Sequence, residues 1–282
     1  MQNIAIIASS KDPAGTNIRN NLIELSSFEK SNEKYDVNEV YEYKQIKNKI
    51  IKLYLINDDL IFSENIDKKI DADAFIFASK HRSKDNTLSF AVHPIGNWDK
   101  ANFGGEEKKL CPSSAVLLKN IFVELNRNAN GTNYEITLEA THHGPFVDKP
   151  AVFAEIGSTE KEWNDMNNGR IIAETIMNSL TNQNKHYKTA IGIGGPHYCN
   201  NFNKIALRTD IAFSHICPKH HLDKLSKELI NQSIEKTAEK VDFILLDWKG
   251  LGTEKQRIVD LLKNLNLEFK RTDQISSKIV DF

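Results

Sequence analysis

The sequence contains few cysteines, and none is placed for a disulfide framework or a cysteine-based zinc site. Cys111, Cys199 and Cys217 are widely spaced, and no C-x-x-C pair is present. An odd number of dispersed thiols argues for a reduced compartment rather than an oxidising one. We therefore expect a cytoplasmic protein.

Long apolar runs are also missing. Met1 leads directly into the short apolar segment 4–8, without the charged region and extended apolar core of a signal peptide. No stretch approaches the length that crosses a bilayer. We expect no membrane partner.

Charge of one sign is not in excess. The 282 residues include 37 Lys and Arg against 38 Asp and Glu, for a formal net charge of −1. No global basic field attracts nucleic acid, although a local basic patch is compatible with this balance. Hydrophobic residues make up 40%, which is ordinary for a globular protein with a large core.

Several common catalytic signatures are absent. The sequence has no H-E-x-x-H and no G-x-S-x-G motif, so a covalent serine mechanism has little support. The glycine-rich stretch 192–195 is not a dinucleotide fingerprint, because His197 takes the place of the third glycine. The stretch also lacks the Lys-Ser/Thr pair of a phosphate-binding P-loop.

What the sequence does contain is an alternation of apolar strands with amphipathic helices. Continuous apolar runs predict buried strands, and apolar residues at helical spacing predict helices. The alternation predicts a three-layer α/β/α sandwich with a mixed, mostly parallel sheet. We expect one domain over residues 1–282, in which residues 26–70 can form a semi-independent insertion.

Local signals add element boundaries. Segments 50–56 and 60–62 are predicted as short strands around a turn, and segment 221–240 is predicted as a helix. Capping-box patterns that begin at Thr159 and Thr253 predict the starts of two further helices.

Three histidine-bearing segments each follow a predicted strand. Ligands of such sheets bind beyond the carboxyl ends of the strands, so we expect the three loops to meet on one sheet. Their histidines suffice for a histidine-rich zinc site or for acid/base catalysis without metal, and their spacing does not decide between the two. The segments are 93–98, 138–145 and 192–201, with His93, His142, His143 and His197 as candidate residues.

The first and third segments also permit structural interpretations. Asn97 can donate its amide to an oxyanion and Trp98 can stack on a base, but both also suit a Pro-Gly turn with a buried indole. Gly194 and Gly195 can let the backbone approach a phosphate or substrate closely, or they can serve close packing at the strand end.

The middle segment places two histidines side by side. On a regular strand His142 and His143 point to opposite faces, so we expect only one of them to face the cleft. Glu139 can orient an imidazole or act as an acid or base. Alternatively, the histidine pair is a hydrogen-bonded feature of the turn at Gly144.

Two further groups are less specific. His81 and Arg82 follow another predicted strand, and they can contact a phosphate or belong to an exposed polar loop. The later pair His220 and His221 is predicted to be solvated rather than catalytic.

These segments resemble the archaeal and plant type of D-aminoacyl-tRNA deacylase. The likeness lies in 93–97 (His-Pro-Ile-Gly-Asn), 139–145 (Glu-Ala-Thr-His-His-Gly-Pro) and 192–198 (Gly-Ile-Gly-Gly-Pro-His-Tyr), and it extends to 74–83. Three long matches in the order of the family are more specific than any short motif. The resemblance implies hydrolysis of the ester between a D-amino acid and tRNA, which keeps D-residues from the ribosome. It also implies a fold similar to phosphorylases and peptidyl-tRNA hydrolases.

The resemblance further implies a zinc ion and, as partner, a tRNA charged with a D-amino acid. An aminoacyl ester is already activated, so water needs only a positioned base and charge stabilisation. Our hypothesis is that His142 or His143, with or without zinc, activates water, and that Glu139 orients an imidazole or binds the α-amino group. Asn97 and the backbone near Gly194 and Gly195 would hold the oxyanion.

The remaining site candidates follow from the same hypothesis, and we expect a monomer. Candidate zinc ligands are His93, His142, His143 and His197. Candidate substrate contacts are Lys80, Arg82, Trp98, Thr141, Gly194 and Gly195, with Lys84 and segment 100–109 as further phosphate contacts.

Two other functions stay open from the motifs alone. A zinc-dependent amidase or peptidase on a similar scaffold would act on free peptides. A non-catalytic module would bind tRNA or a nucleotide through the loop at Gly194 and Gly195.

Overall fold

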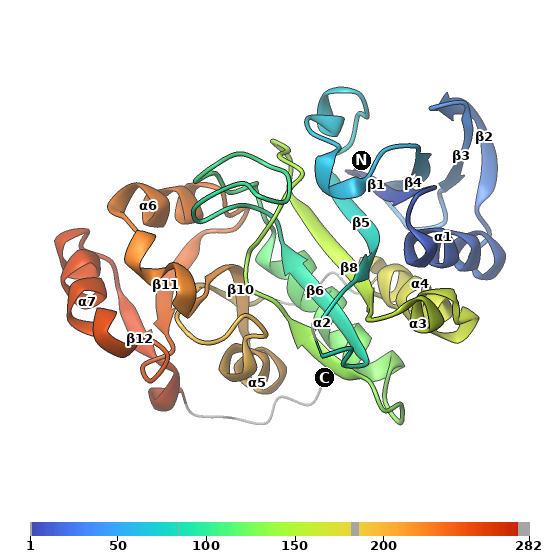
Figure 1. Cartoon of the computed structure of the whole chain (residues 1–282). Coiled ribbons are helices and arrows are strands. Elements are labelled where there is room, and N and C mark those ends of the chain that lie inside the picture. The colour runs from blue at the N-terminus through green and yellow to red at the C-terminus, as the bar shows by residue number, and fades with distance from the viewer. Residues whose placement is uncertain (1, 84, 182–185, 276–282) are drawn as a thin grey trace.

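The fold is built on two β-sheets (Figure 1). It is seen in a computed structural model that describes residues 2–83, 85–181 and 186–275. The larger sheet has the strand order β2-β3-β4-β1-β5-β8-β6-β7, and the smaller has the order β10-β9-β11-β12. The strands are β1 (Gln2–Ser9), β2 (Glu29–Tyr35), β3 (Asn38–Tyr43), β4 (Lys49–Ile56), β5 (Ala74–His81), β6 (Ser89–Pro94), β7 (Glu135–Leu138), β8 (Ala151–Gly157), β9 (Lys188–Ile193), β10 (Ile211–Cys217), β11 (Val241–Leu246) and β12 (Phe269–Arg271).

Strand direction confirms the α/β class with a mixed, mostly parallel sheet. In the larger sheet β4, β1, β5 and β8 are mutually parallel, whereas β6 runs antiparallel to β8 and carries β7 parallel to itself. All pairs of the smaller sheet are parallel. The expectation that the three histidine-bearing loops follow strands of one sheet was wrong, because the strand before His197 belongs to the smaller sheet.

Helices cover one face of the larger sheet and both faces of the smaller one. The strand side chains that point to the helical face of the larger sheet, such as Ile76, Val92 and Ala154, share a core with the first four helices. The fifth helix packs on one face of the smaller sheet, and the last two pack on the other face. The helices are α1 (Pro13–Leu25), α2 (Ala115–Asn128), α3 (Glu160–Asn164), α4 (Met166–Thr181), α5 (Asn200–Arg208), α6 (Lys227–Glu235) and α7 (Lys255–Asn264).

The second face of the larger sheet is covered by loops and short 3-10 turns. Phe75, Phe77 and Phe153 point to this face and pack against the turns that begin at Leu60 and Ile66. Pairing in register places His81, Glu155 and His93 on the same face, since side chains two residues apart on a strand share a side. Polar side chains thus sit on a face whose other residues are largely apolar.

Several local predictions can be compared with these elements. Segment 50–56 is a strand, but the segment Leu60–Phe62 is a 3-10 turn, because it folds back over the sheet instead of pairing. The capping box at Thr159 and Glu162 is confirmed. The helix predicted to begin after Thr253 starts at Lys255 without a side-chain cap, so that capping box was wrong.

Two other segments differ from or extend the expectations. The helix predicted over 221–240 is shorter, consisting of a 3-10 turn at Lys219–Lys224 followed by α6. Strands β2, β3 and β4 extend the larger sheet through the pairing of β4 with β1. The separability of residues 26–70 stays a prediction. Among the described residues, no helix has the length and apolarity that a membrane span requires.

We predict that Gly144→Ala lowers the free energy of unfolding by about 2–3 kcal/mol. A Cβ at position 144 would overlap backbone atoms of Gly104 and Gly105 and lie 2.6 Å from the carbonyl oxygen of Ile61. Backbone cannot rotate away as a side chain does. Thermal and urea unfolding of the variant measure the loss.

Gly252→Ala is the matched control for this experiment. Gly252 has a positive φ of 53° but no atom near its missing Cβ, so only about 1 kcal/mol of backbone strain is expected there. Equal losses in the two variants would show that the loop at Gly144 is not tightly packed.

Candidate active site

A cleft of about 930 Å³ opens over the polar patch of the larger sheet. It lies where the loops that follow β1, β4, β5, β6, β7, β9 and β10 come together, so seven segments of the chain contribute to it. Its lining includes Ser9, Asp12, Asp59, Leu60, Ile61, Ser79, Lys80, His81, Arg82, Ser83, Asp85, Phe103, His142, His143, Glu155, His197, Tyr198 and His220.

Two buried carboxylates lie beneath the histidines of the cleft, and of the two only Glu155 is among the lining residues. Glu139 is fully buried and Glu155 nearly so. The Glu139 carboxylate lies 3.7 Å from His142 Nε2, 3.5 Å from His197 Nε2 and 3.5 Å from His81 Nδ1. Glu155 lies between two of the histidines along the sheet face, 3.4 Å from His81 Nδ1 and 3.7 Å from His93 Nε2.

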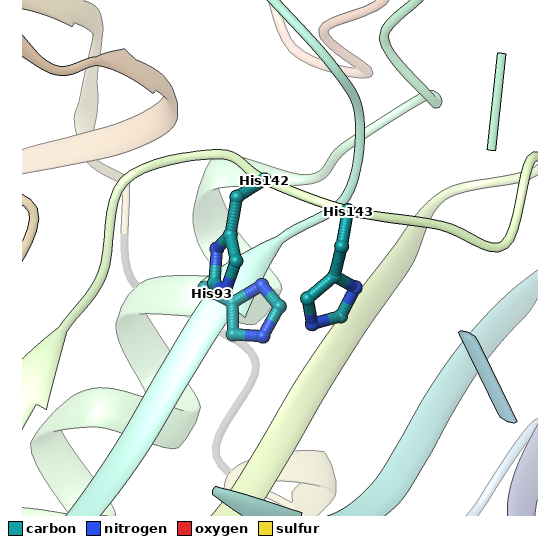
Figure 2. A group of neighbouring side chains, drawn as sticks. All are labelled: His93, His142 and His143. Atoms are coloured by element: carbon teal, nitrogen blue, oxygen red, sulfur yellow. The ribbon is translucent and has the colours of Figure 1, made fainter. Parts of the chain in front are cut away.

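Three imidazoles converge above these carboxylates. Figure 2 shows His142 and His143 descending from one loop toward His93 at the end of β6. One ring nitrogen from each lies within 4.8 Å of the others. The Nδ1 atoms contact the carbonyl oxygens of Pro94, Ala140 and Gly144 at 3.1, 2.8 and 2.6 Å.

These backbone contacts fix the tautomer of all three rings. A carbonyl oxygen can only accept a hydrogen bond, so each neutral ring carries its proton on Nδ1. The Nε2 lone pair is then free to bind a cation or accept a proton. Histidines that ligate metals are oriented by the same kind of hydrogen bond through their other nitrogen.

Burial keeps the upper histidines neutral. Desolvation is the main reason that the pKa of His142 lies well below its usual value, and the neighbouring His93, His143 and His197 lower it further. Desolvation, aided by His93, lowers the pKa of His143 to about 4. Both rings therefore present lone pairs rather than charges at neutral pH.

His81 has the opposite tendency. Burial lowers the pKa of this imidazole, but the hydrogen bond to Glu155 and the charges of Glu139 and Glu155 together raise it to about 9. Although burial raises the pKa of Glu155, the interactions with the neighbouring His81 and His93 hold it well below the usual value. The site thus contains a cationic imidazole beside an ionised carboxylate.

Four atoms of this cluster have no hydrogen-bond partner among the described residues. They are Nε2 of His81, Nε2 of His93 and both carboxylate oxygens of Glu139. Unpaired buried polar atoms are rare and costly in proteins. Imidazole nitrogens and carboxylate oxygens are zinc ligands, so this donor set fits a bound Zn²⁺.

Both adjacent histidines line the cleft, so the expectation that only one would do so was wrong. Strand β7 ends at Leu138, and the backbone of His143 adopts a positive φ of 41°. Regular alternation therefore no longer applies at these positions, and the two ring centroids lie 4.3 Å apart.

The structure brings together five predicted site residues: His93, His142, His143, His197 and Glu139. Lys80 and Arg82 line the same cleft. Glu155 and His93 lie on the face of the sheet, because β6 runs antiparallel to β8, whereas His142, His143 and His197 follow the ends of β7 and β9.

Two predicted site residues of segment 93–98 form structural hydrogen bonds instead of facing the cleft. The amide of Asn97 donates to the carbonyl oxygens of Gly104 at 2.9 Å and Glu106 at 3.3 Å, so it is not available for an oxyanion. Trp98 is 2% exposed and donates its indole N–H to the carbonyl oxygen of Ile216, which leaves no surface for a base.

Three other predicted contacts are also structural. Thr141 is buried and its hydroxyl accepts from the backbone N–H of Ile216. Gly194 and Gly195 have φ of 99° and 81° and lie directly against Asp247, where a Cβ would come within about 3 Å. The two glycines allow close packing at the end of the strand, which is the structural interpretation of this segment.

The sequence interpretation did not identify Glu155 as a site residue or predict the central position of His81. Glu155 is a charged residue inside the apolar run of β8, which was an available signal. His81 was interpreted as a phosphate contact or as part of an exposed polar loop, whereas it lies buried beside Glu139 and Glu155. His220, predicted to be solvated, lines the cleft with its ring centroid 6.4 Å from that of His197.

Comparisons with known proteins agree on one family. The family model for D-aminoacyl-tRNA deacylase matches residues 68–270. Curated D-aminoacyl-tRNA deacylases are 39% identical in Thermococcus kodakarensis and 38% identical in Pyrococcus furiosus, each alignment covering 94% of this chain and 98% of the relative. The relative in Methanosarcina barkeri is 36% identical, with 98% and 91% covered.

A solved structure supports the fold over its full length. The crystal structure of a conserved protein of unknown function has a TM-score of 0.88 and 28% identity to this chain. The superposition covers 100% of this chain and 99% of the other.

Thiol chemistry has no place in this cleft, and we predict that native protein does not react with the thiol reagent DTNB. All three cysteines are buried. Burial raises the pKa of Cys111 to about 12 and also raises the pKa of Cys199 and Cys217 well above the usual value of a thiol, so reactive thiolate is scarce. Absorbance at neutral pH should report no reaction until denaturant is added, and then three thiols. Rapid labelling of native protein would contradict this burial.

Proposed function

The chain belongs to the D-aminoacyl-tRNA deacylase family, whose reaction is hydrolysis of the ester between a D-amino acid and tRNA, and we propose that the histidine cleft performs it. The reaction frees the tRNA and protects translation from D-residues. The family membership inferred from the motifs is confirmed. We further propose that the enzyme acts in the cytoplasm as a monomer.

One observation supports the cleft as the catalytic site. Ring nitrogens of His93, His142 and His143 lie close together, and the unpaired carboxylate of Glu139 lies beside His142. Folding gains nothing from such an arrangement, because unpaired buried polar atoms are unfavourable. A binding or catalytic role accounts for them.

We propose that zinc binds this donor set, with His93, His142 and His143 as ligands. His197 is a further potential ligand, since one atom from each of His197, His142 and Glu139 lies within 4.8 Å of the others. A bound Zn²⁺ would polarise the ester carbonyl and lower the pKa of water.

Different side chains of the cleft would accept the proton and stabilise the developing charge. Glu139 has free oxygens beneath the histidines, so it would accept the proton of the attacking water. His81 is cationic at neutral pH and would stabilise the negative charge that develops on the ester oxygen. Glu155 would keep His81 protonated and in place.

The tRNA must reach the cleft with its charged end. Lys80 and Arg82 line one side of the cleft. We propose that they contact phosphates of the tRNA, which makes affinity fall with rising salt.

We predict that zinc binding depends on the three converging histidines. His93→Ala, His142→Ala and His143→Ala should each lose bound zinc, measured by mass spectrometry of dialysed protein. The exposed His186, outside the cleft, provides the control variant His186→Ala, which should retain zinc. Full zinc occupancy in all four variants would show that the metal lies elsewhere.

We also predict that the protein hydrolyses D-tyrosyl-tRNA and leaves L-tyrosyl-tRNA and D-aminoacyl peptides intact. Glu139→Gln preserves size but cannot accept the proton, so kcat should fall about a hundredfold or more. Release of radiolabelled tyrosine measures each rate. Equal rates on both hands of tyrosyl-tRNA would overturn the chiral function, and peptide cleavage would favour the amidase alternative.

A further inference from the structure

We propose that the cleft has a separate nucleotide arm, in which Tyr198 stacks on the terminal adenine of the tRNA and Arg82 contacts the phosphate next to it. This inference rests on the proposed function and assigns its substrate contacts. It follows from three features of the cleft wall on the side of β5 and β9.

Tyr198 is a large aromatic residue that remains accessible within the cleft. It lines the cavity and is 39% exposed, which is unusual for an aromatic ring in an otherwise packed region. Edge-on contacts with His81 and His197 fix the ring at centroid distances of 6.1 and 5.4 Å. Its carbonyl oxygen accepts hydrogen bonds from Thr137 and Asn203.

A fixed and accessible ring beside the catalytic floor suits a base. Every base has a π-face, and stacking on an aromatic side chain does not require a particular sequence. Since all tRNAs end in the same adenosine, one stacking platform would serve every D-aminoacyl-tRNA. The ester on the ribose would then lie over His197, which adjoins Tyr198 and lies 3.5 Å from the Glu139 carboxylate.

Arg82 continues this wall away from the floor. Its guanidinium carbon lies 5.0 Å from the ring centroid of Trp163, and the Lys80 ammonium lies 5.9 Å from the same ring. Trp163 is buried and donates its indole N–H to the carbonyl oxygen of His81. Among the described residues Arg82 forms no ion pair, so its charge is available to a phosphate.

A second hollow shows where the polynucleotide would leave the cleft. This hollow of about 350 Å³ shares Arg82 and Ser83 with the cleft and is lined further by Asn86, Ser158, Thr159, Glu160 and Trp163. Arg82 thus stands at the junction of the two cavities. A tRNA strand that runs from the stacked adenine into this hollow would bring its phosphate past Arg82.

The other side of the cleft has a different character. Leu60, Ile61 and Phe103 form an apolar wall there. An ester held at the floor would direct its amino-acid side chain toward this wall and its nucleotide toward Tyr198. The two walls therefore match the two halves of the substrate.

Two substrates separate the contacts. D-tyrosyl-tRNA contains the terminal adenosine and the phosphates, whereas D-tyrosyl-adenosine contains the adenosine without any phosphate. Tyr198→Ala is expected to raise KM about ten- to a hundredfold for both substrates with kcat little changed, because stacking binds ground and transition states alike. Tyr198→Phe keeps the ring and should restore KM.

Arg82→Ala should raise KM for D-tyrosyl-tRNA much more than for D-tyrosyl-adenosine, and this difference should shrink at high salt. Arg170→Ala, which removes an exposed arginine of α4 paired with Glu174, is the charge control and should leave both KM values unchanged. Thermal unfolding confirms that each variant is folded.

Several results would overturn the inference. These are an unchanged KM in Tyr198→Ala, a loss confined to kcat, an equal effect of Arg82→Ala on both substrates, or a wild-type enzyme that hydrolyses the tRNA ester but not the adenosine ester. By contrast, a wild-type enzyme that hydrolyses neither D-ester would refute the proposed function itself.

Discussion

The structure depends on burying two carboxylates beneath a cluster of histidines on an apolar sheet face. An unpaired buried polar group costs about 1–3 kcal/mol, and Glu139 alone has two such oxygens. The arrangement persists because the register of β5, β8 and β6 sets His81, Glu155 and His93 along one face. Only a rigid, well-paired sheet can hold these groups together against their preference for water.

The loops above the sheet are held by contacts that converge near the histidines. Glu64 accepts from the backbone N–H of Gly105 at 2.6 Å and also from that of Phe146. The backbone N–H of Gly96 reaches the carbonyl oxygens of His142 and His143. These bonds tie separate loops into one layer, so the orientation of the histidine rings is a property of the whole layer.

Much of the fold and part of the site follow from local sequence. The apolar runs identified the strands, and His93, His142, His143 and His197 stood out because histidines after buried strands are unusual. Asn97 and Trp98 were misjudged because their partners, Gly104 and Ile216, are set by loop packing that no periodicity encodes. The same limit applies to the division of the strands between two sheets.

Glu155 shows why the centre of the site escaped prediction. Its role depends on β6 running antiparallel to β8, which sets Glu155 opposite Ala91 and within reach of His93. If all the strands were parallel, the histidines would gather beyond one edge, where a long substrate could approach freely. In this structure, loops line the cleft around the reactive groups, which favours a substrate with a narrow end. The single-stranded end of a charged tRNA has that shape, and the direction of two strands thereby restricts what the site can accept.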